Sequence, residues 1–149
     1  MTNLGQTIIA QKLEERLIEQ AAINDVSDRL LDWLSDSDMV RSASIQELAA
    51  RLDALRVRVE RYFRQELALA DALILNRGPT LQIVAARTRT ANQRQAILAR
   101  LNSVIGRIKS TMPGEEAWHE ALYELGLITD AIDLYEDSTN DLASLAGHA

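Results

Sequence analysis

Several polar side chains fall where the helical periodicity of this chain calls for apolar ones. Tyr62 and Glu66 lie one turn apart on one apolar stripe, and Tyr135 and Thr139 lie one turn apart on another. The complete set is Gln20, Tyr62, Glu66, Arg94, Tyr135 and Thr139. A buried charge is costly unless it is paired. We therefore expect these side chains either to bond one another or to surround water, a metal or a ligand.

Pairing between Glu66 and Arg94 is the first hypothesis for this set. Their charges fall on two different apolar stripes, and hydroxyl groups nearby would complete the hydrogen bonds. The core polar cluster would then consist of Tyr62, Glu66, Arg94, Tyr135 and Thr139. Two alternatives remain open. A small error in the helix phase would expose both charges to solvent, and the same residues could instead line a functional polar pocket.

Four segments with apolar residues in steps of three and four must position these side chains. They run from about Gln6 to Leu34, from Ser44 to a break at residues 76–79, from Leu81 to Ile108, and from about Glu115 to Leu145. At the break, Gly78 suits a helix end and Pro79 suits the first turn of the next helix. The predicted stripes include Leu17, Leu81, Val84 and Leu122. Short breaks between long helices predict one all-α domain over residues 1–149, an antiparallel up-down-up-down four-helix bundle.

The composition excludes several kinds of chemistry. The chain has 149 residues and no cysteine, which excludes disulfides, thiolate metal sites and a cysteine nucleophile. Its two histidines, His119 and His148, have no partner at the spacing of a metal motif. We see no glycine-rich phosphate loop and no nucleophile elbow, so we expect no enzyme. A cytoplasmic location is expected, because neither a signal peptide nor an apolar run of membrane-spanning length is visible.

Charge is distributed unevenly along the chain. Residues 1–40 carry three basic and eight acidic side chains, residues 41–109 carry thirteen basic and five acidic, and residues 110–149 carry nine acidic and no basic ones. A basic middle between acidic ends is typical of neighbouring helices with complementary faces, and it would also suit an anionic partner.

Short patterns around the polar positions match the motifs of one known family. Residues 62–67 read Y-F-R-Q-E-L against H-F-x-x-E-E, and residues 93–101 read Q-R-Q-A-I-L-A-R-L against E-H-x-x-L-L-x-x-L. Residues 135–143 read Y-E-D-S-T-N-D-L-A against H-E-x-x-E-N-E-L-L, and Glu19-Gln20 stands at an E-H pair. Over most of its layout the chain thus resembles the hemerythrin-like (HHE cation-binding) family. The resemblance implies a four-helix bundle that handles oxygen or iron at a di-iron site.

The departures from these motifs fall on the metal ligands. Gln20, Tyr62, Arg94 and Tyr135 stand where the family has histidine, and Thr139 replaces a carboxylate. Of the vestigial positions, Glu66 alone keeps a ligand-type side chain. One carboxylate with two tyrosines does not supply the imidazole and carboxylate donors that non-haem iron uses. We therefore expect no metal and no cofactor in this member.

Three functions follow as hypotheses. The first is a non-catalytic structural or protein-interaction module whose partner is another protein or a second copy of the chain. The second is a bundle that binds a metal, iron in particular, or a small ligand through Glu66 and the core tyrosines. The third is a regulatory module that binds an anionic partner through a basic row on the second and third helices, Arg51, Arg58, Arg61, Arg64, Arg87, Arg89, Arg100 and Arg107. We expect neither membrane nor nucleic-acid binding, because the net charge is −6 and no recognised motif accompanies the arginines.

Overall fold

The structure, a computed structural model, describes residues 3–36, 45–110 and 114–147. Its four helices are α1 (Asn3–Ser35), α3 (Ile45–Arg77), α4 (Leu81–Lys109) and α5 (Gly114–Gly147). No strand occurs in these ranges, so the predicted all-α class is confirmed. The predicted helix start at Ser44 lies outside the described residues. None of the described helices combines the length and the apolar character that a membrane span requires.

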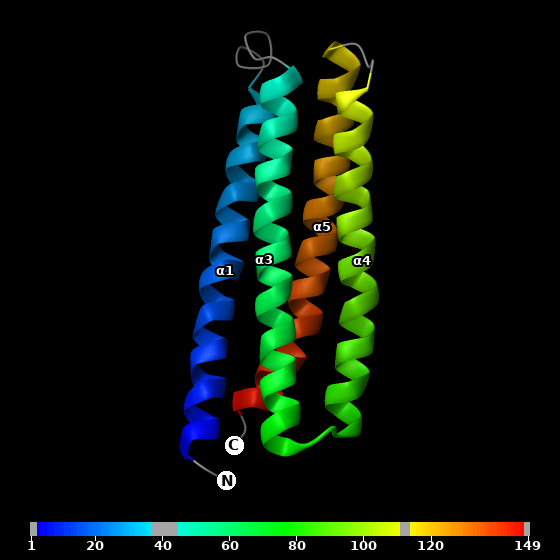
Figure 1. Ribbon diagram of the computed structural model, residues 1–149. Coiled ribbons are helices and arrows are strands. Elements are labelled where there is room, and N and C mark those ends of the chain that lie inside the picture. Colours follow the sequence, from blue (N-terminus) through cyan, green and yellow to red (C-terminus); the bar gives the residue numbers. More distant parts are fainter. Residues whose placement is uncertain (1–2, 37–44, 111–113, 148–149) are drawn as a thin grey trace.

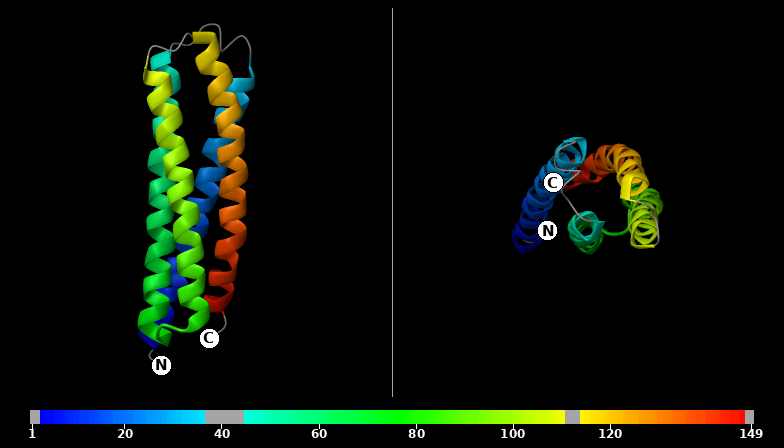
Figure 2. Two further views of the ribbon diagram at one scale, coloured as in Figure 1. Left: turned by 90° about the vertical axis from the view of Figure 1, so that its right-hand side faces the viewer. Right: turned by 90° about the horizontal axis from the view of Figure 1, so that it is seen from above.

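The four helices form an antiparallel bundle. Successive helices run in opposite directions, so that α1 begins and α5 ends at the same end of the molecule (Figure 1). Viewed down the bundle, α1 and α5 lie on one side, and α3 and α4 lie on the other (Figure 2). Each helix packs against its two neighbours in this ring, with the closest packing between α1 and α3 and between α4 and α5. The up-down-up-down order is the one that short connections between long helices predict.

The turn between α3 and α4 depends on two residues. Gly78 has a φ of 81°, a left-handed conformation that glycine adopts without a steric penalty, and its N–H donates to the Ile74 carbonyl at 2.8 Å. Thr80 caps α4, because its hydroxyl accepts a hydrogen bond from the N–H of Ile83 at 3.3 Å. Pro79 therefore precedes the cap, and its predicted place in the first turn of α4 is wrong.

The apolar core consists of two clusters. The larger one fills the half of the bundle in which α1 ends and α3 begins (Figure 1), and there Trp33 and Trp118 pack with their ring centroids 4.8 Å apart. The smaller one lies toward the α3–α4 turn and contains Ile9, Leu69, Ala70, Leu73, Ile83 and Ala86. Arg16 on α1, Glu66 on α3 and Thr90 on α4 are buried at positions between the two clusters. The core is thus interrupted by polar residues.

Part of the predicted apolar stripes is out of phase. Leu17 is 59 % exposed and Leu81 is 85 % exposed, while Val84 and Leu122 are also exposed. On α1, a spacing of seven residues joins the buried Ile9, Arg16, Ile23 and Leu30, so Leu17 lies one residue off the buried series. On α4 the buried series begins at Ile83. Each of these errors is a phase error along a single helix, and packing against the neighbouring helices decides which residues are buried.

Candidate functional site

Six side chains meet at the boundary of the larger apolar cluster that faces the smaller one, and we call them the polar layer. They are Arg16, Tyr62, Glu66, Arg94, Tyr135 and Thr139. All four helices contribute to the layer. Five of the six side chains are buried, and Arg94 is half-buried. The five residues of the predicted core polar cluster are therefore brought together, and Arg16 joins them.

Arg16 occupies the centre of the layer. Its Nε donates to Glu66 Oε1 in a close ion pair, and both residues are only 2 % exposed. Its Nη2 donates to Thr139 Oγ1 at 3.0 Å and to Asn140 Oδ1 at 3.1 Å. One guanidinium thus connects α1 with α3 and α5. Hydrogen bonds to several oxygens are what a charge needs to be tolerated at this depth.

The predicted pairing of Glu66 with Arg94 is therefore wrong, because Glu66 forms its ion pair with Arg16. Arg94 Nη1 donates to Thr90 Oγ1 at 3.2 Å and to the Tyr135 hydroxyl at 3.5 Å. These two neutral oxygens hold the Arg94 guanidinium on the α4–α5 side, whereas Glu66 forms its ion pair with Arg16 on α1. The field of Arg94 still reaches Glu66 and favours its charged form.

The two tyrosines pack as neutral aromatic groups. Their rings meet edge to face with centroids 5.7 Å apart, and the Phe63 ring lies 4.9 Å from that of Tyr135. Burial raises the pKa of both phenols, and the Glu66 carboxylate raises that of Tyr62 further. The Tyr62 hydroxyl and Glu66 Oε2 are buried, and neither makes a hydrogen bond of standard geometry with a described residue. Burial raises the pKa of both groups, and the closeness of Thr139 to Tyr62 and of Tyr62 to Glu66 offsets a small part of each shift. These two atoms are the least satisfied part of the layer.

A second buried carboxylate lies beside the layer. Burial raises the pKa of Glu136 on α5, and the neighbouring Gln20 and Asn24 of α1 offset part of this shift. Gln20 therefore supports Glu136 at the edge and does not enter the polar layer. Arg16 and Glu136 are not among the polar residues predicted from the sequence. A seven-residue spacing through Ile9, Ile23 and Leu30 points to Arg16, whereas Glu136 follows a tyrosine already assigned to the stripe and carries no such signal.

The side chains of the layer do not fit a dinuclear iron centre. Glu66 Oε1 is engaged by a guanidinium, and the raised pKa values of Tyr62 and Tyr135 disfavour the phenolate forms that bind metals. In the part of the chain that the structure describes, no three His, Cys, Asp or Glu side chains converge. A positively charged arginine lies where such a centre would need anionic and imidazole donors.

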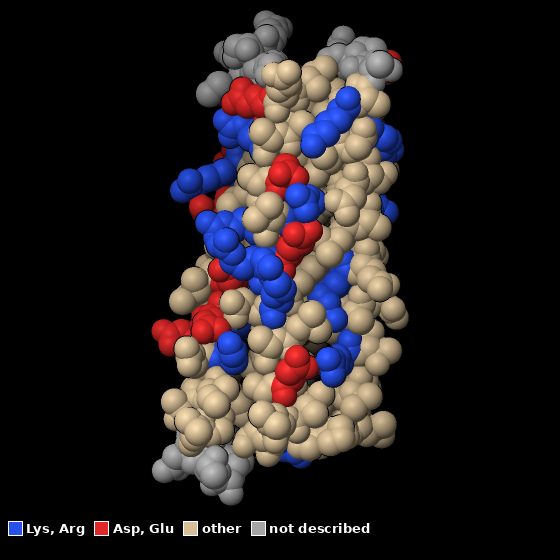
Figure 3. Space-filling model, in the orientation of Figure 1, with Lys and Arg blue, Asp and Glu red and all other residues tan. Residues whose placement is uncertain are grey.

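Most of the basic row on α3 and α4 pairs with acidic side chains. Cross-helix pairs join Arg58 to Glu19, Arg87 to Asp71, Arg100 to Glu124 and Arg107 to Glu120, at 3.9, 3.0, 3.6 and 2.7 Å. Arg51 pairs with Glu47 within α3 at 3.0 Å. Figure 3 shows acidic groups interspersed among the basic ones on this face. The uneven charge therefore serves mainly to join neighbouring helices, and each exposed pair adds little stability.

Removing the charge of Arg16 should strongly destabilise the fold. Arg16→Met leaves Glu66 buried without its cation, and the free energy of unfolding should fall by about 3–5 kcal/mol. The double variant with Glu66→Leu should recover most of this loss, because the buried carboxylate is removed together with its cation. Arg94→Met is the control and should cost about 1–2 kcal/mol, since it removes bonds to neutral oxygens. Urea denaturation measures all three, and equal losses for Arg16→Met and Arg94→Met would contradict the assignment.

Stability should also depend on pH through Glu66. Burial raises the pKa of this carboxyl above its usual 4.5, and Arg16 offsets only part of the shift. Between the unfolded-state and folded-state pKa values, the folded state keeps a proton that the unfolded state releases. The stabilisation of the folded state by this proton is therefore complete below pH 4.5 and is lost as the pH rises through the folded-state pKa. The unfolding free energy of the native protein should therefore fall relative to that of Glu66→Gln between pH 4.5 and neutrality. A difference that stays constant over this range would refute the prediction.

Comparison with known proteins identifies no relative of this chain. No family model matches it, and neither a curated protein nor a solved structure is significantly similar. The site is therefore interpreted from its own residues and geometry.

Proposed function

We propose that the chain is a non-catalytic bundle of hemerythrin-like layout that serves as a structural or protein-interaction module in the cytoplasm. A bundle of that layout holds its metal in the interior between the helices. In this chain a guanidinium, that of Arg16, lies in the interior and is bonded to α3 and α5. This arrangement supports a role of the polar layer in holding the helices together.

An apolar patch at the end of the bundle supports the interaction role and is the observation on which it rests. Leu4 at the start of α1 is 70 % exposed, and Leu75 near the end of α3 is 89 % exposed. Together with Ile8 they surround a hollow of about 250 Å³ between the two helices. We call Leu4, Ile8 and Leu75 the apolar patch. Clustered apolar side chains in solvent mark contact sites in soluble proteins.

A second copy of the chain is the partner we propose for the apolar patch. Two identical patches can cover each other about a twofold axis, which is the commonest symmetry of protein assemblies. Each large aliphatic side chain removed from water stabilises by about 1.5–3 kcal/mol. Association itself costs about 4–15 kcal/mol. The six side chains of two patches together contribute an amount of similar size to this cost. The dimer should therefore be weak and should form in the micromolar range or above.

Sedimentation velocity over a range of protein concentrations tests this association. The native protein should move from monomer toward dimer as its concentration rises, and Leu75→Ser should remain monomeric. Leu134→Ser is the matched control, because Leu134 is also mostly exposed but lies on α5, away from the patch. A native protein that sediments as Leu75→Ser does at every concentration would overturn the role of this patch.

Iron loading separates this proposal from the metal-binding hypothesis. The unsatisfied Glu66 Oε2 and Tyr62 hydroxyl are the observation that favours a ligand in the interior. After incubation with Fe(II) and desalting, we nevertheless expect far less than one iron per chain, with equal amounts in native protein and in Glu66→Gln. One or two irons per native chain, lost in Glu66→Gln, would establish the metal-binding function instead.

A further inference from the structure

The surface between α3 and α4 contains a hollow that the proposed interaction module does not use. Its volume is about 430 Å³, and it lies beside the outer edge of the polar layer. Phe63, Leu67 and Leu98 provide an apolar lining, with Phe63 buried and the two leucines half-buried. Two arginines, Arg64 and Arg94, line the same hollow. A pocket with an apolar lining and a few charged groups is the usual form of a small-molecule site.

Arg94 brings a positive charge into this hollow without a carboxylate of its own. Its hydrogen bonds go to the hydroxyls of Thr90 and Tyr135, which are neutral. Glu66 is close enough to act on it electrostatically, but that carboxylate forms its ion pair with Arg16. Two guanidinium groups thus face one carboxylate on this side of the layer. A half-buried charge in this position is stabilised when an anion approaches it.

The other charged groups of the hollow leave the field positive. Arg64 is exposed, and it makes no ion pair or hydrogen bond with any other described residue. Glu60 is the acidic group in the lining, and it pairs with Arg56 at 2.8 Å. In Figure 3, basic groups follow the strip where α3 and α4 lie side by side. The charge of the hollow therefore complements an anion.

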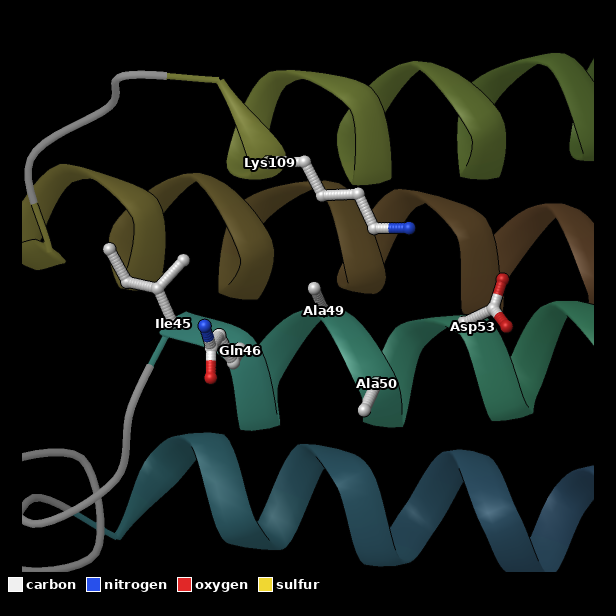
Figure 4. A pocket seen from close by; sticks show the side chains of 6 residues that line it. All are labelled: Ile45, Gln46, Ala49, Ala50, Asp53 and Lys109. Atoms are coloured by element: carbon white, nitrogen blue, oxygen red, sulfur yellow. The ribbon is translucent and has the colours of Figure 1, made fainter.

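A second hollow on the same side of the bundle provides a contrast. It has a volume of about 350 Å³ and lies nearer the α1–α3 connection, with Ala49, Ala50 and Ile45 in its lining. Figure 4 shows that Lys109 extends from α4 along this hollow and that its side chain points toward Asp53 on α3. One basic and one acidic group give this hollow no net charge, and its alanines offer less apolar surface. It therefore lacks the features that distinguish the Arg94 hollow.

We propose that the Arg94 hollow binds an organic anion with a compact apolar body, such as a medium-chain carboxylate. The carboxylate group pairs with Arg64 and Arg94, since a guanidinium offers parallel N–H donors that match two carboxylate oxygens. The carbon chain lies against Phe63, Leu67 and Leu98 and leaves water there. This site is independent of the apolar patch, which lies at the end of the bundle.

Titration with octanoate, followed by isothermal calorimetry and amide chemical shifts, tests the site. Native protein should bind octanoate with shifts at residues of the hollow, and it should bind acetate and octanol more weakly. Arg64→Gln and Arg94→Met should each weaken octanoate binding roughly ten- to a hundredfold, the loss expected for a hydrogen bond to a charged group. Leu67→Ser should weaken octanoate binding but leave the weak acetate binding unchanged.

Two features keep this test decisive. Arg64 is exposed and pairs with no residue in the described ranges, so Arg64→Gln should remain folded even if Arg94→Met does not. Lys109→Gln removes a positive charge at the second hollow and should leave octanoate binding unchanged. Equal binding of octanol and octanoate, equal weakening by Arg64→Gln and Lys109→Gln, or no binding of octanoate at millimolar concentration would each overturn the proposal.

Discussion

The buried ion pair between Arg16 and Glu66 constrains how the four helices pack. Both charges are almost completely buried, and in that environment each is tolerated only with its partner in place. If α1 slid by one turn, about 5.4 Å along α3, the carboxylate would lose its cation and the cation would enter an apolar cluster. We infer that the pair fixes the register of α1 against α3, and that Thr139 extends this register to α5.

The polar layer balances its charge in a different way from a metal-binding bundle. A hemerythrin-like site needs anionic and imidazole donors around a cation. Here the cation is a side chain, and the groups around it are one carboxylate, two hydroxyl-bearing rings, a threonine and an asparagine. The charge balance of the interior is therefore met within the chain, except at Arg94, where a guanidinium faces neutral oxygens and opens onto the surface.

Charge on the outside of the bundle follows a related pattern. The basic middle of the chain forms α3 and α4, and the acidic ends form α1 and α5, so opposite charges meet across two helix–helix boundaries. Pairs such as Arg58 with Glu19 and Arg107 with Glu120 use most of this charge internally. The two surface features to which we assign a partner or ligand are therefore local, namely the apolar patch at the end of the bundle and the Arg94 hollow.

The sequence by itself determined the helices, their approximate ends and the burial of Tyr62, Glu66, Tyr135 and Thr139, because a three-to-four spacing fixes which residues share a face. It did not determine that Glu66 pairs with Arg16 rather than Arg94, nor that Leu17 and Leu81 lie outside the core. Periodicity describes one helix at a time and tolerates an error of one residue. Which charge meets which depends on the relative rotation and axial position of several helices, and the tertiary structure alone decides both.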